Sequence, residues 1–187
     1  TDKLYGGGTD HRLAQEVLLG IGGVRAVREF CRVTGHPTPE VYHANEGHAV
    51  LLGLERIREQ MVAGDDFDTA VERTRAGMVF ATHTPVPAGI DRVAIDLLRN
   101  QFANVSPLPM DRILALGAED YPGGDRGCFN MAVLGLRLSQ RANGVSELND
   151  LLATFENVNK AVITGTRSGK DVSAALDQRD GLLKKIS

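Results

Sequence analysis

The chain has 187 residues and a net charge of −3, with 42% apolar and 24% charged residues. This composition is that of an ordinary globular protein, and the small negative charge argues against a nucleic-acid or anionic-membrane partner. Two cysteines are too few for a disulfide framework, and no apolar run approaches the roughly 20 residues of a membrane span, which favours a cytoplasmic protein. Residues 1–8 lack both an initial methionine and the apolar region of a signal peptide, so we expect a piece of a longer protein.

The first half of the sequence predicts helices and strands in alternation. Residues 10–19 and 24–33 are expected to be helical, with Thr9 or Asp10 capping the first helix. The glycines of GIGG (20–23) are expected to interrupt them, since glycine costs about 1 kcal/mol in a helix interior. A loop, a strand, two helices and a second strand are then predicted at 35–39, 40–44, 46–61, 67–77 and 78–82. The order strand, helix, helix, strand predicts an α/β fold whose parallel strands are joined by a helical crossover.

The second half of the sequence is predicted to be mainly helical. Helices are expected at 92–102, 110–117 and 131–142, with a loop at 121–127. The last forty residues predict two polar helices, 146–163 and 171–187, joined by a turn at 165–170, with Asp171 or Ser173 capping the second. One apolar stripe on the first of these helices predicts a C-terminal helical hairpin of coiled-coil type, and comprises Leu148, Leu152, Phe155, Val158 and Val162.

Two polar loops leave the carboxyl ends of the predicted strands, HANEGH (43–48) and HTPVPAG (83–89). In a parallel sheet these ends meet at one edge, which is where ligands bind in open α/β folds. Two prolines stiffen the second loop, and the amide, carboxylate and imidazole groups of the two loops suit the hydroxyl groups of a sugar. Capping or core packing is the alternative role for either histidine. The side chains expected around one cleft are Asn45, Glu46, His48, His83 and Thr84.

Three further patterns fit known motifs poorly. The spacing HxxExH at 43–48 differs from the HExxH of zinc enzymes. GTRSGKD (165–171) lacks the spacing of a phosphate-binding loop, and GIGG does not follow a strand, as a dinucleotide-binding fingerprint would. The sequence therefore predicts neither a metal site nor a nucleotide site.

Four stretches, in order along the chain, resemble consecutive motifs of the short bacterial α-glucan (glycogen and maltodextrin) phosphorylases. They are LYGGGTDHRLAQEVLLGIGGVRAVR (4–28), VYHANEGHAVLLGLERIRE (41–59), VFATHTPVPAGIDR (79–92) and FNMAVLGLRLSQRANGVSEL (129–148). The resemblance implies that residues 1–147 are a fragment of the N-terminal, Rossmann-like domain of a GT-B glycosyltransferase. It implies reversible phosphorolysis of α-1,4-glucan to glucose 1-phosphate with pyridoxal phosphate. The histidine matching His83 contacts the sugar in that family, and the segment matching 45–48 borders the cleft.

The chain departs from this family at identifiable positions. Gly8 stands where the family usually has aspartate, and Asn149 and Asp150 stand where it has histidine and glycine. The family's pyridoxal lysine and phosphate-binding basic residues belong to its C-terminal domain. They are expected to lie outside this chain, which predicts that the chain alone is inactive.

The C-terminal residues 148–187 resemble a different family, the flagellar hook-associated protein of the hook–filament junction, especially in ALDQRDGLLKKIS (175–187). That family is exported, in conflict with a cytoplasmic enzyme, and builds tubes from helical hairpins, which implies a fusion with its seam near 146–150. Two hypotheses follow. The chain is an α-glucan phosphorylase fragment with a foreign tail, or a structural module that self-associates through its helices and carries an α/β passenger. The greater length of the first resemblance favours the enzyme.

Overall fold

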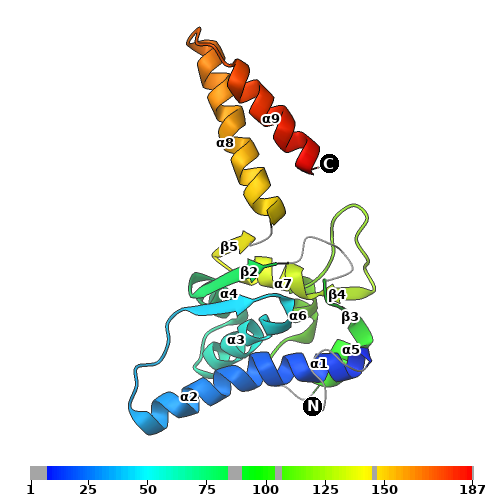
Figure 1. Ribbon diagram of the computed structural model, residues 1–187. Coiled ribbons are helices and arrows are strands. Elements are labelled where there is room, and N and C mark those ends of the chain that lie inside the picture. The colour runs from blue at the N-terminus through cyan, green and yellow to red at the C-terminus, as the bar shows by residue number, and fades with distance from the viewer. Residues whose placement is uncertain (1–7, 84–89, 104–106, 145–146, 187) are drawn as a thin grey trace. The chain divides into compact units, whose positions relative to one another are not determined.

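The computed structural model describes residues 8–83, 90–103, 107–144 and 147–186 (Figure 1). The chain divides into two compact units, residues 1–143 and 144–187, and each is described by itself. Predictions that fall on Thr84 and on the prolines of the following loop lie outside the described residues.

Helices and short strands alternate as far as residue 144 (Figure 1). In chain order the elements are α1 (Thr9–Val17), the π-helical turn η1 (Leu18–Gly22), α2 (Gly23–Thr34), β1 (Tyr42–Asn45), the 3₁₀ turn η2 (Gly47–Ala49), α3 (Leu52–Val62), α4 (Phe67–Ala76), β2 (Met78–Thr82), β3 (Arg92–Ala94), α5 (Ile95–Phe102), α6 (Met110–Leu116), β4 (Cys128–Asn130), α7 (Met131–Leu138) and β5 (Arg141–Gly144).

The main sheet has the strand order β1-β2-β5, and a second sheet pairs β3 with β4 antiparallel. Strands β1 and β2 are parallel, with Tyr42 opposite Met78 and Asn45 opposite Ala81. The predicted parallel pairing and its crossover through α3 and α4 are confirmed. Four apolar side chains of this crossover are fully buried: Val50, Leu51, Leu54 and Ile57.

The long N-terminal helix differs from its prediction. GIGG does not end the helix, because η1 passes the chain from α1 into α2 with one π-helical turn. A close contact explains why glycine stands at position 20 of this segment: a Cβ there would lie 2.7 Å from the Leu52 backbone nitrogen. At position 20, only glycine therefore allows the helix to lie this close to the start of α3. The predicted cap is wrong, because Gly8 is the N-cap and no side chain caps the helix.

Several other boundaries differ for reasons of tertiary structure. The predicted helix 46–61 begins only at Leu52, after a 3₁₀ turn. The predicted helix 92–102 begins with strand β3, which pairs with β4. The predicted helix 131–142 ends at Leu138, and the chain then enters β5. Strands β3 and β4 have three residues each, too few to show a periodic pattern, and β5 is mostly exposed and has no apolar alternation, so the sequence predicts none of the three.

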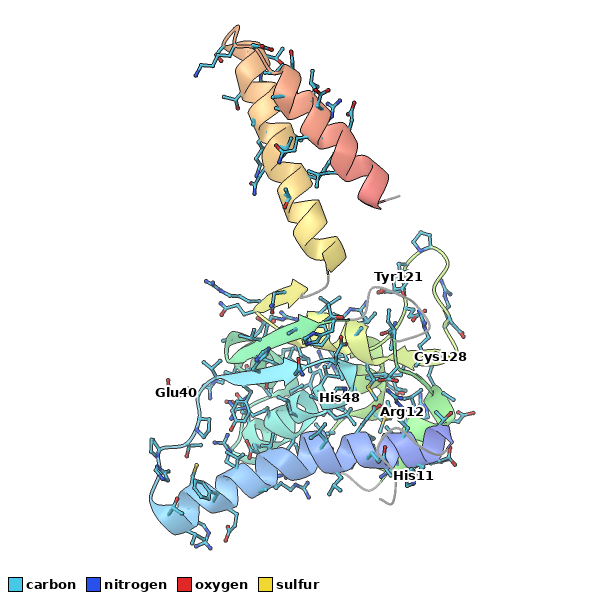
Figure 2. All side chains as sticks on the ribbon, in the orientation of Figure 1. His11, Arg12, Glu40, His48, Tyr121 and Cys128 are labelled. Atoms are coloured by element: carbon cyan, nitrogen blue, oxygen red, sulfur yellow. The ribbon has the colours of Figure 1, made fainter. Side chains whose placement is uncertain are left out.

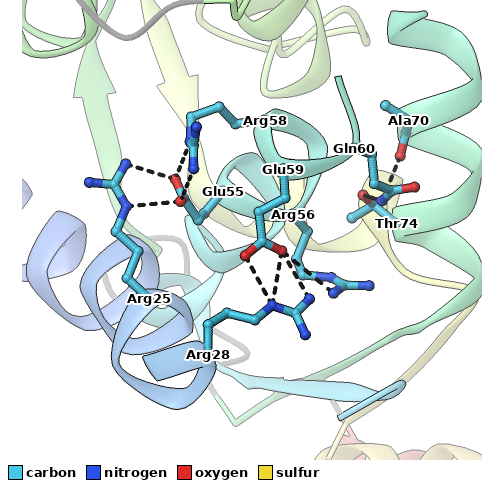
Figure 3. Close-up of polar contacts among 9 residues, drawn as sticks. All are labelled: Arg25, Arg28, Glu55, Arg56, Arg58, Glu59, Gln60, Ala70 and Thr74. Atoms are coloured by element: carbon cyan, nitrogen blue, oxygen red, sulfur yellow. Dashed lines mark hydrogen bonds and ion pairs between the residues drawn. The ribbon is translucent and has the colours of Figure 1, made fainter. Parts of the chain in front are cut away.

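Two glutamates of α3 tie this helix to α2 (Figure 3). Glu55 is almost completely buried and accepts hydrogen bonds from Arg25 at 2.8 and 3.1 Å and from Arg58 at 2.9 and 2.7 Å. Burial by itself would raise the pKa of Glu55, but the hydrogen bonds from Arg58 and Arg25 outweigh it, and the pKa lies below its ordinary value. Glu59 accepts from Arg28 at 2.9–3.3 Å in the same way.

Glu119 joins β3, β4 and the loop between α6 and β4. Its buried carboxylate accepts hydrogen bonds from Arg92 Nε at 2.6 Å, from Asn130 Nδ2 at 2.6 Å and from the backbone N–H of Asp125 at 2.8 Å. The bonds from Asp125 and Asn130, and then the pairing with Arg92, lower the pKa of Glu119 to about 2. Asn130 also caps α7, because its Oδ1 accepts from the backbone N–H groups of Ala132 and Val133.

The second unit contains α8 (Glu147–Arg167) and α9 (Ser173–Ile186), which lie side by side (Figure 1). Val158, Val162 and Leu182 are buried between them, and Asp171 accepts from the Ser173 backbone N–H at 3.0 Å where α9 begins. The predicted stripe positions Leu148 and Leu152 lie outside the described side chains. None of the helices described is long and apolar enough to cross a membrane. The flagellar, coiled-coil character of this unit stays a prediction.

Two glycine substitutions on the N-terminal helix test the close approach of η1 to α3. Gly20→Ala is expected to destabilise the protein by about 1–3 kcal/mol, because the new methyl group would overlap backbone atoms that cannot move aside. Gly23→Ala meets no atom within 4 Å and is expected to stabilise it by about 0.5–1 kcal/mol, since alanine loses less conformational freedom in a helix. Urea unfolding measures both, and equal effects would contradict the packing role of Gly20.

Glu119 predicts a specific loss of stability in acid. Because the pKa of Glu119 falls from 4.5 to about 2 on folding, its carboxylate contributes stability that is complete above about pH 4.5 and is lost as the pH falls toward 2. The difference in unfolding free energy between the unmodified chain and Glu119→Gln should therefore be largest near pH 6 and shrink toward pH 3. Glu72→Gln, which removes an exposed partner of Arg75, is the control and should show little difference at either pH. A difference for Glu119→Gln that does not vary with pH would contradict the assignment.

Candidate functional site

The carboxyl ends of β1 and β2 bring three of the five predicted site residues together. Asn45 Oδ1 lies 2.5 Å from His83 Nε2, and Glu46 Oε1 accepts a hydrogen bond from the backbone N–H of His83. The backbone N–H of Glu46 donates to the carbonyl of Ala81 at 2.8 Å, which continues the β1–β2 pairing one residue beyond β1. The prediction that the two loops meet at one edge of a parallel sheet is confirmed for these residues.

The other two predicted site residues, His48 and Thr84, are not among these contacts. His48 lies in η2 and is half-buried, two residues beyond Glu46 (Figure 2). Thr84 lies outside the described residues. The part of the chain that the structure describes contains no group of three or more His, Cys, Asp and Glu side chains able to hold a metal ion.

Glu46 has a strained backbone, which sequence reasoning missed. Its φ of 69° and ψ of 170° fall in a region that is essentially reserved for glycine. The hydrogen bond to Ala81 and the bond from the Ala49 N–H to the Glu46 carbonyl, at 3.2 Å, hold it there. Such strain costs about 1–3 kcal/mol and clusters at functional sites. The backbone strain therefore indicates a functional site at the turn after β1, and this indication does not depend on which side chains the turn carries.

The Asn45–His83 contact limits the hydrogen bonds that the site can make. An amide oxygen only accepts, so His83 Nε2 is assigned as the donor in this pair. In the neutral ring Nδ1 is then an acceptor, while the exposed amide group of Asn45 carries two donor hydrogens. Donors and acceptors thus lie next to one another at an exposed edge, the arrangement that hydroxyl groups require. The chemistry suits binding of a polyhydroxylated ligand.

A second set of residues lies behind this edge. Gly47 is buried, and a Cβ there would lie 3.1 Å from Met131 Cβ and 3.8 Å from Asp91 Oδ2. Asp91 pairs with Arg12 of α1 (Figure 2 labels Arg12) at 2.7 Å. No signal in the sequence indicated this contact, because 79 residues separate its partners.

Comparison with known proteins adds an independent observation. No family model matches the chain. It is 54% identical over 159 residues to the glycogen phosphorylase of Mycobacterium tuberculosis, 40% identical over 149 residues to the maltodextrin phosphorylase of Thermococcus litoralis, and 28% identical over 152 residues to the glycogen phosphorylase of Aquifex aeolicus. These alignments cover 79–80% of this chain.

Four fifths of the chain is homologous to a segment of the glycogen and maltodextrin phosphorylases. The matched segment makes up 18% of the M. tuberculosis phosphorylase, 17% of the T. litoralis phosphorylase and 21% of the A. aeolicus phosphorylase. None of these relatives is a flagellar protein, so the flagellar resemblance of residues 148–187 stays a prediction.

The strained turn of this phosphorylase-like segment can be tested with two substitutions at one position. Both Glu46→Gly and Glu46→Ala remove the carboxylate that binds the His83 N–H, but only glycine adopts a φ of 69° without steric cost. Glu46→Gly is therefore expected to be more stable than Glu46→Ala by about 1 kcal/mol, the reverse of the usual preference for alanine. Urea unfolding of the two variants measures the difference, and an alanine variant of equal or greater stability would show that the turn is unstrained.

Proposed function

We propose that this chain is a segment of an α-glucan phosphorylase, and that Asn45, Glu46 and His83 contribute one edge of the site that binds the glucosyl residue of the glucan. The observation that supports it is the coincidence of phosphorylase homology with a strained, polar sheet edge, where the Asn45 amide contacts the His83 imidazole and the Glu46 carboxylate accepts from the His83 backbone N–H. His48 and Thr84 are assigned to the same cleft.

In this proposal the edge binds and orients sugar hydroxyl groups. His83 is held through both its backbone N–H and its ring, so its orientation is set before a ligand arrives. A binding group that is already oriented loses little entropy when the ligand binds. The parallel β1–β2 pair fixes the distance between the two loops and so the spacing of the hydrogen-bonding groups.

We further propose that residues 1–147 form part of the N-terminal domain of a GT-B phosphorylase. Pyridoxal phosphate attaches to proteins through a lysine. The lysines of this chain are Lys3, Lys160, Lys170, Lys184 and Lys185, so residues 4–159 contain none. Apart from Lys3, residues 1–147 thus offer no lysine for a pyridoxal site, and another part of the enzyme would hold the cofactor and the phosphate. Residues 148–187 are a separate helical module in this proposal, and no observation favours a function for the chain based on that module.

The proposal predicts sugar binding without catalysis. Titration with maltopentaose should shift the NMR signals of Asn45, Glu46 and His83, and His83→Ala should weaken binding roughly tenfold, the effect of losing about 1.4 kcal/mol. His36→Ala removes an exposed histidine that stacks on Phe30 and is the matched control. With phosphate, and with or without added pyridoxal phosphate, the purified chain should release no glucose 1-phosphate. Release above background would refute the inactivity, and an absence of shifts at saturating glucan would refute the proposed site.

A further inference from the structure

Arg12, Glu16 and Asp91 form a cluster of charged side chains next to the turn that carries Glu46. Arg12 of α1 pairs with Glu16, one turn further along the helix, at 3.3 Å and with Asp91 at 2.7 Å. The side chain of Glu16 is 3% exposed and that of Asp91 is 18% exposed. Arg12 itself is 39% exposed, so two largely buried carboxylates share one guanidinium that still reaches solvent.

Asp91 connects this cluster to the turn. Its Oδ2 lies on the side of Gly47 where a side chain would stand, 3.8 Å from the position that a Cβ would take. Its carbonyl accepts from the backbone N–H of Met131 at 3.0 Å, where α7 begins. A shift of Asp91 would therefore reach the turn through Met131 at the start of α7, whose Cβ lies closest to Gly47.

Glu16 is the least satisfied member of the cluster. Its Oε2 is buried and has no hydrogen-bond partner among the residues that the structure describes. Burial, and then repulsion by Asp91, raise the pKa of Glu16 to about 7, although Arg12 acts in the opposite direction. Arg12 on the same helix and Asp91 before β3 are the charged groups that act on Glu16, while the neighbouring His11 is exposed and pairs with Gln15.

We propose that Glu16, acting through Arg12 and Asp91, is a positioning residue for the sugar-binding turn at residues 45–48. When Glu16 is neutral, Arg12 is committed to Asp91, which then holds the backbone at Gly47. When Glu16 ionises, it competes for the same guanidinium and the hold on Asp91 weakens. The coupling of Glu16 to the turn is a property of this chain, whereas its effect on glucan binding rests on the proposed function.

The coupling is tested by NMR of the whole chain. The amide signals of Glu46 and Gly47 are followed from pH 5 to 8.5 in the unmodified chain, in Glu16→Gln and in Asp91→Asn. A transition near pH 7 is expected in the unmodified chain and should be lost in both variants. Glu16→Gln removes one carboxylate and leaves all five histidines in place, so the difference between the two proteins isolates Glu16. Glu29→Gln, which removes an exposed partner of Arg32 on α2, is the matched control and should leave the transition unchanged.

A titration with maltopentaose separates this inference from the proposed function. Binding is expected to weaken roughly tenfold between pH 6 and pH 8 in the unmodified chain, and to vary much less in Glu16→Gln, which cannot ionise. If the Gly47 transition persists unchanged in Glu16→Gln, the inference is overturned, whether or not the sugar binds. If the transition depends on Glu16 but maltopentaose binds at no pH, the coupling stands and the proposed function fails. Glu16→Gln and Asp91→Asn each break the cluster, so if one of them does not fold, the other still decides whether the Gly47 transition depends on it.

Discussion

The parallel pairing of β1 with β2 is the constraint on which the candidate site depends. It places the carboxyl ends of both strands at one edge, and the bond from the Glu46 N–H to the Ala81 carbonyl extends the pairing into the turn. His83 follows β2 directly, so its backbone N–H and its ring lie within reach of Glu46 and Asn45. An antiparallel arrangement would have placed these residues at opposite ends of the sheet.

The charges of the first unit are tied together by arginine rather than lysine. Residues 4–159 contain no lysine, and the buried carboxylates of Glu16, Glu55 and Glu119 all pair with guanidinium groups. Arginine keeps its charge at any ordinary pH and binds a carboxylate through two donors. In these ion pairs it is therefore the carboxylate whose charge changes with pH. The pKa values of two of these carboxylates are shifted in opposite directions. The pKa of Glu119 is lowered to about 2 by three hydrogen bonds, whereas that of Glu16 is raised to about 7 by burial and then by repulsion from Asp91.

Close approach of backbone to backbone is the second recurring feature. Gly20 lets η1 lie against the start of α3, and Gly47 lets the turn after β1 lie against Met131 at the start of α7. Each contact holds a neighbouring segment at a distance that a side chain would not permit. The turn at Glu46 is consequently fixed from two sides, by the sheet edge and by the packing of Gly47, which accounts for a strained conformation persisting in a residue other than glycine.

The sequence alone determined the α/β class, the parallel strand pair and the location of the polar loops, because these follow from periodicity, glycine and proline positions and the crossover rule. It also indicated the phosphorylase resemblance, which the comparisons support over four fifths of the chain. Only the tertiary structure decided the π-helical turn at Gly20, the strands β3, β4 and β5, the strain at Glu46 and the Glu16–Arg12–Asp91 cluster. Each of these depends on contacts between residues far apart in the chain, for which local patterns hold no signal: Gly20 meets Leu52, and Arg12 meets Asp91.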